Sequence, residues 1–306
     1  MKYKSFCYSH SGNIGDEVQT LATEQHMPSV DGHVDRDGLA LLNDEDEPFV
    51  VIMNGWYSNN PKHCLPAAKC VIPVFWGIHI NRDQSTIDYF LSGERLEYFK
   101  EHEPIGCRDP QTTNMLKEKG IDAFYSKCLT HTFPKREKAP QKGKIFLSDL
   151  VKIPIPDELF QQGVELTQFE KDFYGVEIKR LKAARNLEML RDEASLVITS
   201  KIHCAMPCAA MGIPVIYFGN PKEYRVQVLK DMGLTVYQKP SKYVGALYQI
   251  LRKTKLGPIF RKLYVKIKYS KVNWDPKEIE YEDEKKRLTA ELKKHVEFCL
   301  ERHLSK

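Results

Sequence analysis

The chain has 306 residues, a formal net charge of +5, 42% hydrophobic residues and 28% charged residues. These values are typical of a soluble globular protein, and no apolar run approaches the ~20 residues that span a bilayer, which excludes an integral helical membrane protein. The N-terminus lacks the apolar segment of a signal peptide, so we expect a cytoplasmic protein whose eight cysteines are reduced thiols. The length favours two domains.

The N-terminal segment predicts a strand, a glycine-rich turn and a helix. Aromatic residues alternate with other residues over 3–9, two glycines follow, and helical periodicity extends over about 16–26. Asp16 is the expected N-cap of this helix, and that role alone is one explanation of the residue. Ligands often bind at such a strand–turn–helix connection, which here contains Asn13 and Asp16. The glycine spacing is not that of a dinucleotide-binding loop, so no dinucleotide site is expected.

The first half of the chain continues with alternating strands and helices. Strands are predicted over 49–53, 71–80, 105–109 and 123–126, and helices over 86–101 and 111–119. Alternation of this kind predicts a doubly wound, Rossmann-like domain over residues 1–133.

Polar and aromatic residues follow two of these strands. Asn54 and Trp56 come directly after the apolar run 49–53, where an aromatic ring could stack on a sugar or pack into the core. Arg108 follows a shorter strand and could bind an anion or form an ion pair with an acid such as Asp109.

The second half predicts another Rossmann-like domain over 144–251, after a polar linker at 134–144. Its clearest element is a compact strand–helix–strand unit with strands over 196–198 and 215–218 and a helix over 204–211. Such a unit implies a parallel sheet. Pro207 is expected to be tolerated only in the first turn of that helix.

Three polar residues lie where this unit passes from strand to helix. Ser200, Lys201 and His203 follow the carboxyl end of the first strand, which is the sheet edge where ligands bind in open α/β proteins. A cation and an imidazole beside a helix N-terminus favour an anion site. A buried histidine in an ordinary turn is the alternative.

Cys204 and Cys208 are spaced like a metal clip on a helix, but no second Cys/His pair has a matching spacing. We therefore expect no metal site.

The C-terminal segment 252–306 is predicted as a helical tail that is first basic and then acidic. Eight Lys/Arg and no acids occur over 252–271. On a helix, Ile259, Phe260, Leu263 and Ile267 form one stripe. The stripe could lie on an anionic membrane surface, which would make the protein membrane-peripheral, or it could pack on the second domain.

Several motifs in order resemble those of the polysaccharide pyruvyl transferases. They are Gly12-Asn13 with Gly15-Asp16, Asn54-Gly55-Trp56, Gly106-Cys107-Arg108-Asp109, Ser126-x-Cys128-Leu129-Thr130, Thr199-Ser200-Lys201-Ile202-His203 and Gly212-Ile213-Pro214-Val215-Ile216. The second and fourth of these motifs resemble one subgroup of the family. Two positions depart from the pattern, since Lys201 replaces the usual Arg of the family and Lys127 replaces the usual Gly of that subgroup.

The resemblance implies two Rossmann-like domains facing a cleft, the glycosyltransferase B-type architecture, and a role in polysaccharide biosynthesis. It implies transfer of the enolpyruvyl group of phosphoenolpyruvate to sugar hydroxyls as a pyruvate ketal, with no other cofactor. The first domain would be the acceptor side and would contribute Arg108, while Lys201 and His203 would form the donor side. The partners would be phosphoenolpyruvate and a sugar or lipid-linked glycan, and no nucleic acid.

The expected roles follow from the donor's chemistry. Its carboxylate and phosphate require cations, supplied by Arg108 and Lys201, and proton transfer requires a group such as His203. The residues expected to bind substrate are Asn13, Asp16, Asn54, Trp56 and Ser200, and Glu17 is an alternative to Asp16.

Two other functions remain open at this point. A nucleotide-sugar-dependent glycosyltransferase would need an acidic residue for the ribose, for which Glu223 is the nearby candidate. A non-catalytic glycan-binding relative would keep the fold without the chemistry.

Overall fold

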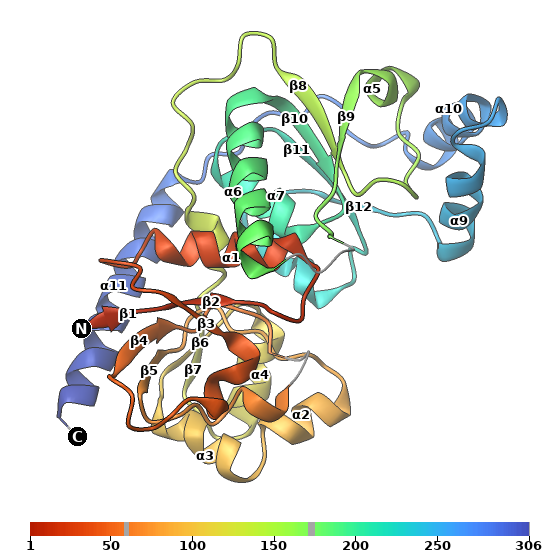
Figure 1. Cartoon of the computed structure of the whole chain (residues 1–306). Coiled ribbons are helices and arrows are strands. Elements are labelled where there is room, and N and C mark those ends of the chain that lie inside the picture. Colours follow the sequence, from red (N-terminus) through yellow and green to blue (C-terminus); the bar gives the residue numbers. More distant parts are fainter. Residues whose placement is uncertain (58–60, 171–174, 306) are drawn as a thin grey trace. The chain divides into compact units, whose positions relative to one another are not determined.

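A computed structural model describes residues 1–57, 61–170 and 175–305 of the chain (Figure 1). Within these ranges the chain forms two compact units. Unit 1 comprises residues 1–133, 171–184 and 282–306, and unit 2 comprises residues 134–170 and 185–281. Every strand pair in the described residues is parallel, so the protein is an α/β protein with parallel sheets.

Unit 1 contains three small sheets in its described part, with the orders β1-β4-β5, β2-β3 and β6-β7. The strands are β1 (Lys2–Tyr3), β2 (Ser5–Cys7), β3 (His33–Asp35), β4 (Phe49–Ile52), β5 (Val71–Val74), β6 (Ile105–Cys107) and β7 (Ala123–Tyr125). All four residues of β4 are buried, as expected of an apolar strand covered on both faces. The strand predicted over 71–80 ends earlier, at Val74, and Gly77 beyond it has a left-handed φ of 72°.

The helices of unit 1 follow the predicted order with one division. They are α1 (Ile14–Glu24), α2 (Gln84–Phe90), α3 (Gly93–Glu101), α4 (Pro110–Glu118), α11 (Glu282–Leu304) and the first part of α6 (Val176–Glu193). The helix predicted over 86–101 is two helices, because Gly93 has a φ of 54° and interrupts the helical path.

Unit 2 has one parallel sheet with the order β12-β11-β10-β8-β9. Its strands are β8 (Lys144–Ser148), β9 (Gly163–Leu166), β10 (Ala194–Thr199), β11 (Val215–Gly219) and β12 (Val236–Gln238). The predicted strand–helix–strand unit is confirmed, because β10 pairs directly with β11 and α7 (Ile202–Ala210) connects them. The expectation for Pro207 is wrong, since it lies well inside α7 rather than in its first turn.

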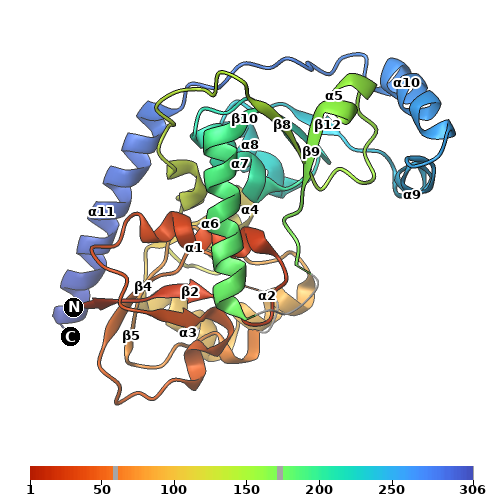
Figure 2. The same cartoon turned by 45° about the horizontal axis from the view of Figure 1, so that its top comes forward.

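The remaining helices of unit 2 are α5 (Asp157–Gln162), α8 (Gln227–Asp231), α9 (Lys242–Leu251), α10 (Leu256–Lys268) and the end of α6. Aromatic rings pack against the sheet, where the Phe218 ring lies 4.9 Å from that of Tyr269 and 5.9 Å from that of Trp274. Figures 1 and 2 show α9 and α10 beside each other at one end of this unit.

The segment predicted as one tail contributes to both units, with α10 in unit 2 and α11 in unit 1. In unit 1, α11 packs beside β5, and His295 Nε2 lies 3.1 Å from the carbonyl oxygen of Phe75. None of the described helices combines the length and apolar character needed to traverse a bilayer.

Candidate functional site

The glycine-rich turn places Asp16 inside α1 rather than at its cap. Asn13 is the N-cap, and its Oδ1 accepts a hydrogen bond from the Gly15 backbone N–H at 3.1 Å. Asp16 is buried in the first helical turn, where Oδ2 accepts from Ser11 Oγ at 2.5 Å and Oδ1 accepts from Asn13 Nδ2 at 3.0 Å. The predicted capping role of Asp16 is therefore wrong, because Asn13 satisfies the helix end and also fixes the carboxylate.

Gln19 connects the predicted residues of unit 1. Its Nε2 donates to Asp16 Oδ1 at 3.3 Å, and its Oε1 accepts from Arg108 Nη1 at 3.1 Å. Asn54 Nδ2 donates to the Gln19 carbonyl oxygen at 3.4 Å and to Thr23 Oγ1 at 3.0 Å. Four predicted residues therefore lie around one face of α1: Asn13, Asp16, Asn54 and Arg108. Sequence reasoning missed Gln19, although its position three residues after Asp16 on a helix was a usable signal.

Arg108 does not take the expected alternative partner. The Asp109 carboxylate instead accepts hydrogen bonds from the Thr112 backbone N–H at 2.9 Å and contacts His79 Nδ1 at 2.7 Å. Burial opposes ionisation of Asp109, but the hydrogen bond and charge of His79, followed by the charge of Arg108, lower its pKa. Asp109 is thus the N-cap of α4 and the partner of a buried histidine that sequence reasoning missed.

Two adjacent carboxyl groups of α1 are buried together. Burial raises the pKa of Asp16, against the opposing hydrogen bond from Ser11 and the charges of Arg36 and Arg108. Burial also raises the pKa of Glu17 to about 7, and nearby Lys179 only partly offsets this effect.

Lys179 of α6 holds the glycine-rich turn in place. Its Nζ is buried, donates to the carbonyl oxygens of Tyr8 and of Ser11, the latter at 2.7 Å, and lies 3.9 Å from Glu17 Oε1. The lysine therefore fixes the backbone that carries Ser11 and Asn13. No local pattern marked this residue, because its partners lie more than 160 positions earlier in the chain.

Trp56 is half-buried, so part of its side chain remains accessible. Its carbonyl oxygen accepts a hydrogen bond from Arg36, and its backbone pairs with that of His79 in an isolated bridge. Gly77 lies close to the neighbouring Asn54, since a Cβ at position 77 would be 2.3 Å from Asn54 Oδ1. These contacts fix the strand end that bears Asn54 and Trp56.

In unit 2, the other predicted residues follow β10. Ser200 Oγ donates to the Asp149 carbonyl oxygen at 3.0 Å, and the Lys201 backbone N–H donates to Thr199 Oγ1 at 3.0 Å. Lys201 is the N-cap residue of α7, and the half-buried His203 is in its first turn. The three predicted residues therefore lie together at the carboxyl edge of β10.

Asp149 completes this edge and was missed by sequence reasoning. It follows β8, has a left-handed φ of 54°, and its carboxylate accepts hydrogen bonds from Gln168 N–H at 2.9 Å and Thr167 Oγ1 at 3.1 Å. Its place directly after a buried strand, beside β10, was the available signal.

A sequence model described as "Polysaccharide pyruvyl transferase" matches residues 13–222, a range that begins at the N-cap of α1 and extends past His203. The chain belongs to the polysaccharide pyruvyl transferase family. This membership indicates a transferase of polysaccharide biosynthesis that has a glycan acceptor, and it confirms the resemblance seen in the motifs.

Among solved structures, the chain is similar to that of a functionally uncharacterized protein from Klebsiella pneumoniae subsp. pneumoniae. The identity is 15%, the alignment covers 78% of this chain and 93% of that chain, and the TM-score is 0.49. Comparison with curated proteins finds no match.

The backbone at Lys127 has the conformation that glycine favours. Its φ is 61°, in the left-handed region that glycine adopts without strain. In this chain the Lys127 side chain extends to α11, where Nζ lies 2.5 Å from Glu284 Oε1.

Across 1–57, 61–170 and 175–305, no group of three or more His, Cys, Asp or Glu residues is arranged to hold a metal ion. Cys204 and Cys208 are both buried free thiols.

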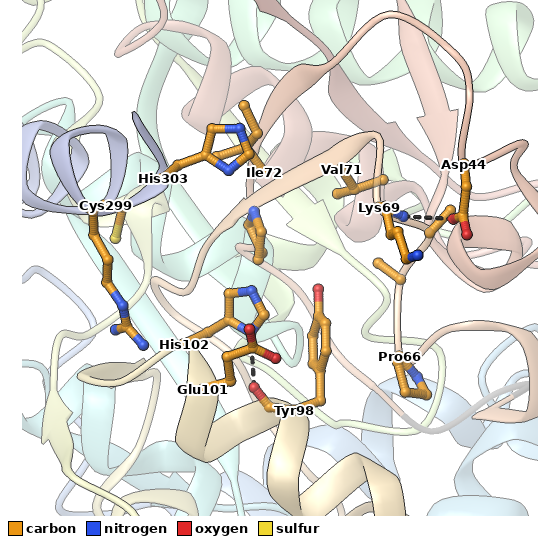
Figure 3. A pocket seen from close by; sticks show the side chains of 14 residues that line it. Asp44, Pro66, Lys69, Val71, Ile72, Tyr98, Glu101, His102, Cys299 and His303 are labelled. Carbon is orange, nitrogen blue, oxygen red and sulfur yellow. Dashed lines mark hydrogen bonds between the residues drawn. The ribbon is translucent and has the colours of Figure 1, made fainter. Parts of the chain in front are cut away.

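A cavity of about 700 Å³ lies in unit 1 at the N-terminal end of β5 (Figure 3). Val71 and Ile72 at the start of the strand line it, with Tyr98 of α3, the C-cap residue His102 and the end of α11 at His303. Because the strands are parallel, this cavity is at the opposite sheet edge from Asn54. None of its lining residues is among the site residues that the sequence predicts.

Proposed function

We propose that the protein transfers the enolpyruvyl group of phosphoenolpyruvate to two hydroxyls of a glycan or glycan-precursor sugar, forming a pyruvate ketal. Family membership supports this proposal. The structural observation that carries it is the bond between Arg108 and the neutral amide of Gln19, at 3.1 Å. This neutral partner orients the guanidinium without forming an ion pair with it, so the guanidinium suits an anionic donor, although its charge also acts on the nearby Asp16 and Asp109.

The donor's carboxylate and phosphate are bound, in this proposal, by Arg108 and Lys201. Arginine offers a planar pair of donors that suits a carboxylate or phosphate, and lysine offers a point charge. Lys201 is the N-cap residue of α7, so the N-terminus of that helix adds favourable polarity for an anion. The proposed architecture is the glycosyltransferase B type, supported by the parallel sheets and helices within each unit.

His203 acts as the proton-transfer group. The first sugar hydroxyl adds to the central carbon of the enolpyruvyl group as the methylene carbon receives a proton and becomes a methyl group. The second hydroxyl then bonds to the same carbon, phosphate leaves, and the two hydroxyl protons balance the new methyl group and the released phosphate. An imidazole can both accept and donate a proton, which suits both directions of proton transfer.

The acceptor is positioned, in the same proposal, by the polar network on α1 and the strand end beside it. Asp16 and Asn13 are fixed by mutual hydrogen bonds, and Asn54 is fixed by Thr23. The accessible part of Trp56 stacks on a sugar face. Ser200 holds the donor edge in shape through its bond to the Asp149 carbonyl oxygen.

The test is isothermal titration of the full chain with phosphoenolpyruvate. We expect the wild type to bind and Arg108→Ala to show no measurable binding, because the oriented guanidinium is lost. Arg185→Ala is the matched control, since Arg185 is exposed on α6, and it should bind as the wild type does.

A parallel titration with UDP-glucose distinguishes the main alternative. Binding of UDP-glucose without binding of phosphoenolpyruvate would contradict the proposal in favour of a nucleotide-sugar glycosyltransferase. Wild-type affinity for phosphoenolpyruvate in Arg108→Ala would remove Arg108 from the site.

A further inference from the structure

Two adjacent helices of unit 2 present large apolar side chains to solvent. On α10, Leu256, Ile259, Leu263 and Ile267 recur at steps of three and four and are 57%, 64%, 58% and 59% exposed. On α9, Tyr243, Leu247 and Ile250 recur in the same way and are also exposed. Together these seven side chains are the α9–α10 apolar surface.

The faces of α9 and α10 opposite this apolar surface are the ones that pack within unit 2. The Phe260 ring stacks between Tyr248 of α9, at 5.7 Å, and Tyr264, at 5.8 Å. Arg261 is buried and forms an ion pair with Asp157 of α5. Of the stripe predicted from sequence, Phe260 therefore packs on unit 2, whereas Ile259, Leu263 and Ile267 do not. The apolar surface is additional to what holds α10 in place.

The same segment is strongly basic. Residues 242–271 contain nine Lys/Arg and no Asp/Glu. Two of them form ion pairs within unit 2, Arg252 with Glu165 and Arg261 with Asp157. The other seven are exposed: Lys242, Lys253, Lys255, Lys262, Lys266, Lys268 and Lys271. At 100° per residue, Lys262 and Lys266 flank the exposed stripe of α10 on its solvent side.

We propose that the α9–α10 apolar surface docks on an anionic lipid membrane. A bilayer surface offers negatively charged headgroups above an apolar interior, which matches an apolar stripe bordered by lysines. A second copy of the chain is a poorer occupant, because it would oppose two basic segments that contain no acid. The surface lies beyond residues 13–222, which the family model matches, and the proposal does not rest on pyruvyl transfer.

The test is co-sedimentation of the full chain with two kinds of vesicle, phosphatidylcholine alone and phosphatidylcholine mixed with phosphatidylglycerol. The wild type should sediment with the mixed vesicles at low salt, should be released at high salt, and should not sediment with phosphatidylcholine alone. Two variants separate the contributions. The apolar variant is Ile259→Ser with Leu263→Ser and Ile267→Ser, and the charge variant is Lys262→Gln with Lys266→Gln.

Each variant should lower the vesicle partition coefficient by about tenfold or more. The charge variant loses the attraction of two basic residues to the anionic surface, and the apolar variant loses the apolar contact with the membrane. The control is Lys293→Gln with Lys294→Gln, which removes two exposed charges from α11 of unit 1 and should leave partition unchanged. All substituted side chains are exposed, and matching thermal melting curves by circular dichroism establish that the variants are folded.

Three results would overturn the proposal. One is the absence of co-sedimentation with anionic vesicles at low salt. Another is an equal loss of partition in the α11 control, which would mean that charge alone is responsible. The third is a wild-type dimer without vesicles that the apolar variant converts to a monomer, which would identify the surface as an interface between copies.

Discussion

At the residue scale, Lys127 has two opposing effects on the stability of the folded protein. Its left-handed φ costs a non-glycine residue about 1 kcal/mol, while its ammonium group pairs with Glu284. Hydrogen bonds from Arg287 and Lys127 lower the pKa of Glu284 to about 2, so the pair is ionised at neutral pH.

We predict that Lys127→Gly is more stable than Lys127→Ala by about 1 kcal/mol, because both lose the ion pair but only glycine relieves the backbone strain. Urea unfolding of the two variants measures the difference. Lys119, an exposed residue with a φ of −93°, is the control position, where alanine should be at least as stable as glycine. An alanine variant as stable as the glycine variant at position 127 would show that the backbone there is not strained.

Glu17 gives a pH dependence at the same scale. Its pKa rises from 4.5 to about 7 in the folded protein because it is buried, and neither carboxyl oxygen has a hydrogen bond in the described structure. The folded state therefore holds this proton more tightly than the unfolded chain does. The stabilisation is complete below about pH 4.5 and is lost as the pH rises to about 7.

Removing this group should flatten the pH profile. Between pH 4.5 and pH 7, the unfolding free energy of the wild type should fall by about 3 kcal/mol more than that of Glu17→Gln. Glu297→Gln, at an exposed position of α11, is the control and should follow the wild type. Parallel profiles for Glu17→Gln and the wild type would mean that folding does not raise the pKa of Glu17.

At the element scale, the strand–helix–strand unit of unit 2 could be predicted because both strands are apolar runs and Gly212 ends the helix between them. The position of α1 was less accessible, since Asn13 and Asp16 are both favourable N-caps and composition alone does not choose between them. Pro207 lies inside α7, where it has no N–H to donate to the helical hydrogen-bond ladder, and local composition did not place it there.

The residues of the candidate site also differ in how well the sequence predicts them. Residues that directly follow strands could be found from the sequence, as Asn54, Arg108 and Lys201 were. Residues that act through distant contacts could not, because Lys179 contacts Ser11 only once α6 is packed. For α10, periodicity predicts the apolar stripe but not whether another element covers it.

At the scale of the whole molecule, the chain does not divide in sequence order. The C-terminal helix α11 belongs to unit 1, where Lys285 Nζ donates to the Phe133 carbonyl oxygen at 3.0 Å. The change from a basic to an acidic segment near residue 275 lies just before this helix. Charge pattern thus marked the boundary, while the return of the chain to unit 1 depends on packing that no local pattern encodes.

The central claim, ketal-forming transfer from phosphoenolpyruvate, is tested most directly by phosphate release together with a new ketal methyl group. Wild-type protein is incubated with 3-¹³C-phosphoenolpyruvate and a glycan-precursor fraction from the source cells, and both products are followed by NMR. The account predicts equal amounts of phosphate and ketal methyl. His203→Ala should slow both by about 10²–10⁴-fold, while His63→Ala, an exposed control, keeps the wild-type rate. Unchanged turnover in His203→Ala, or phosphate release without a ketal, would contradict the account.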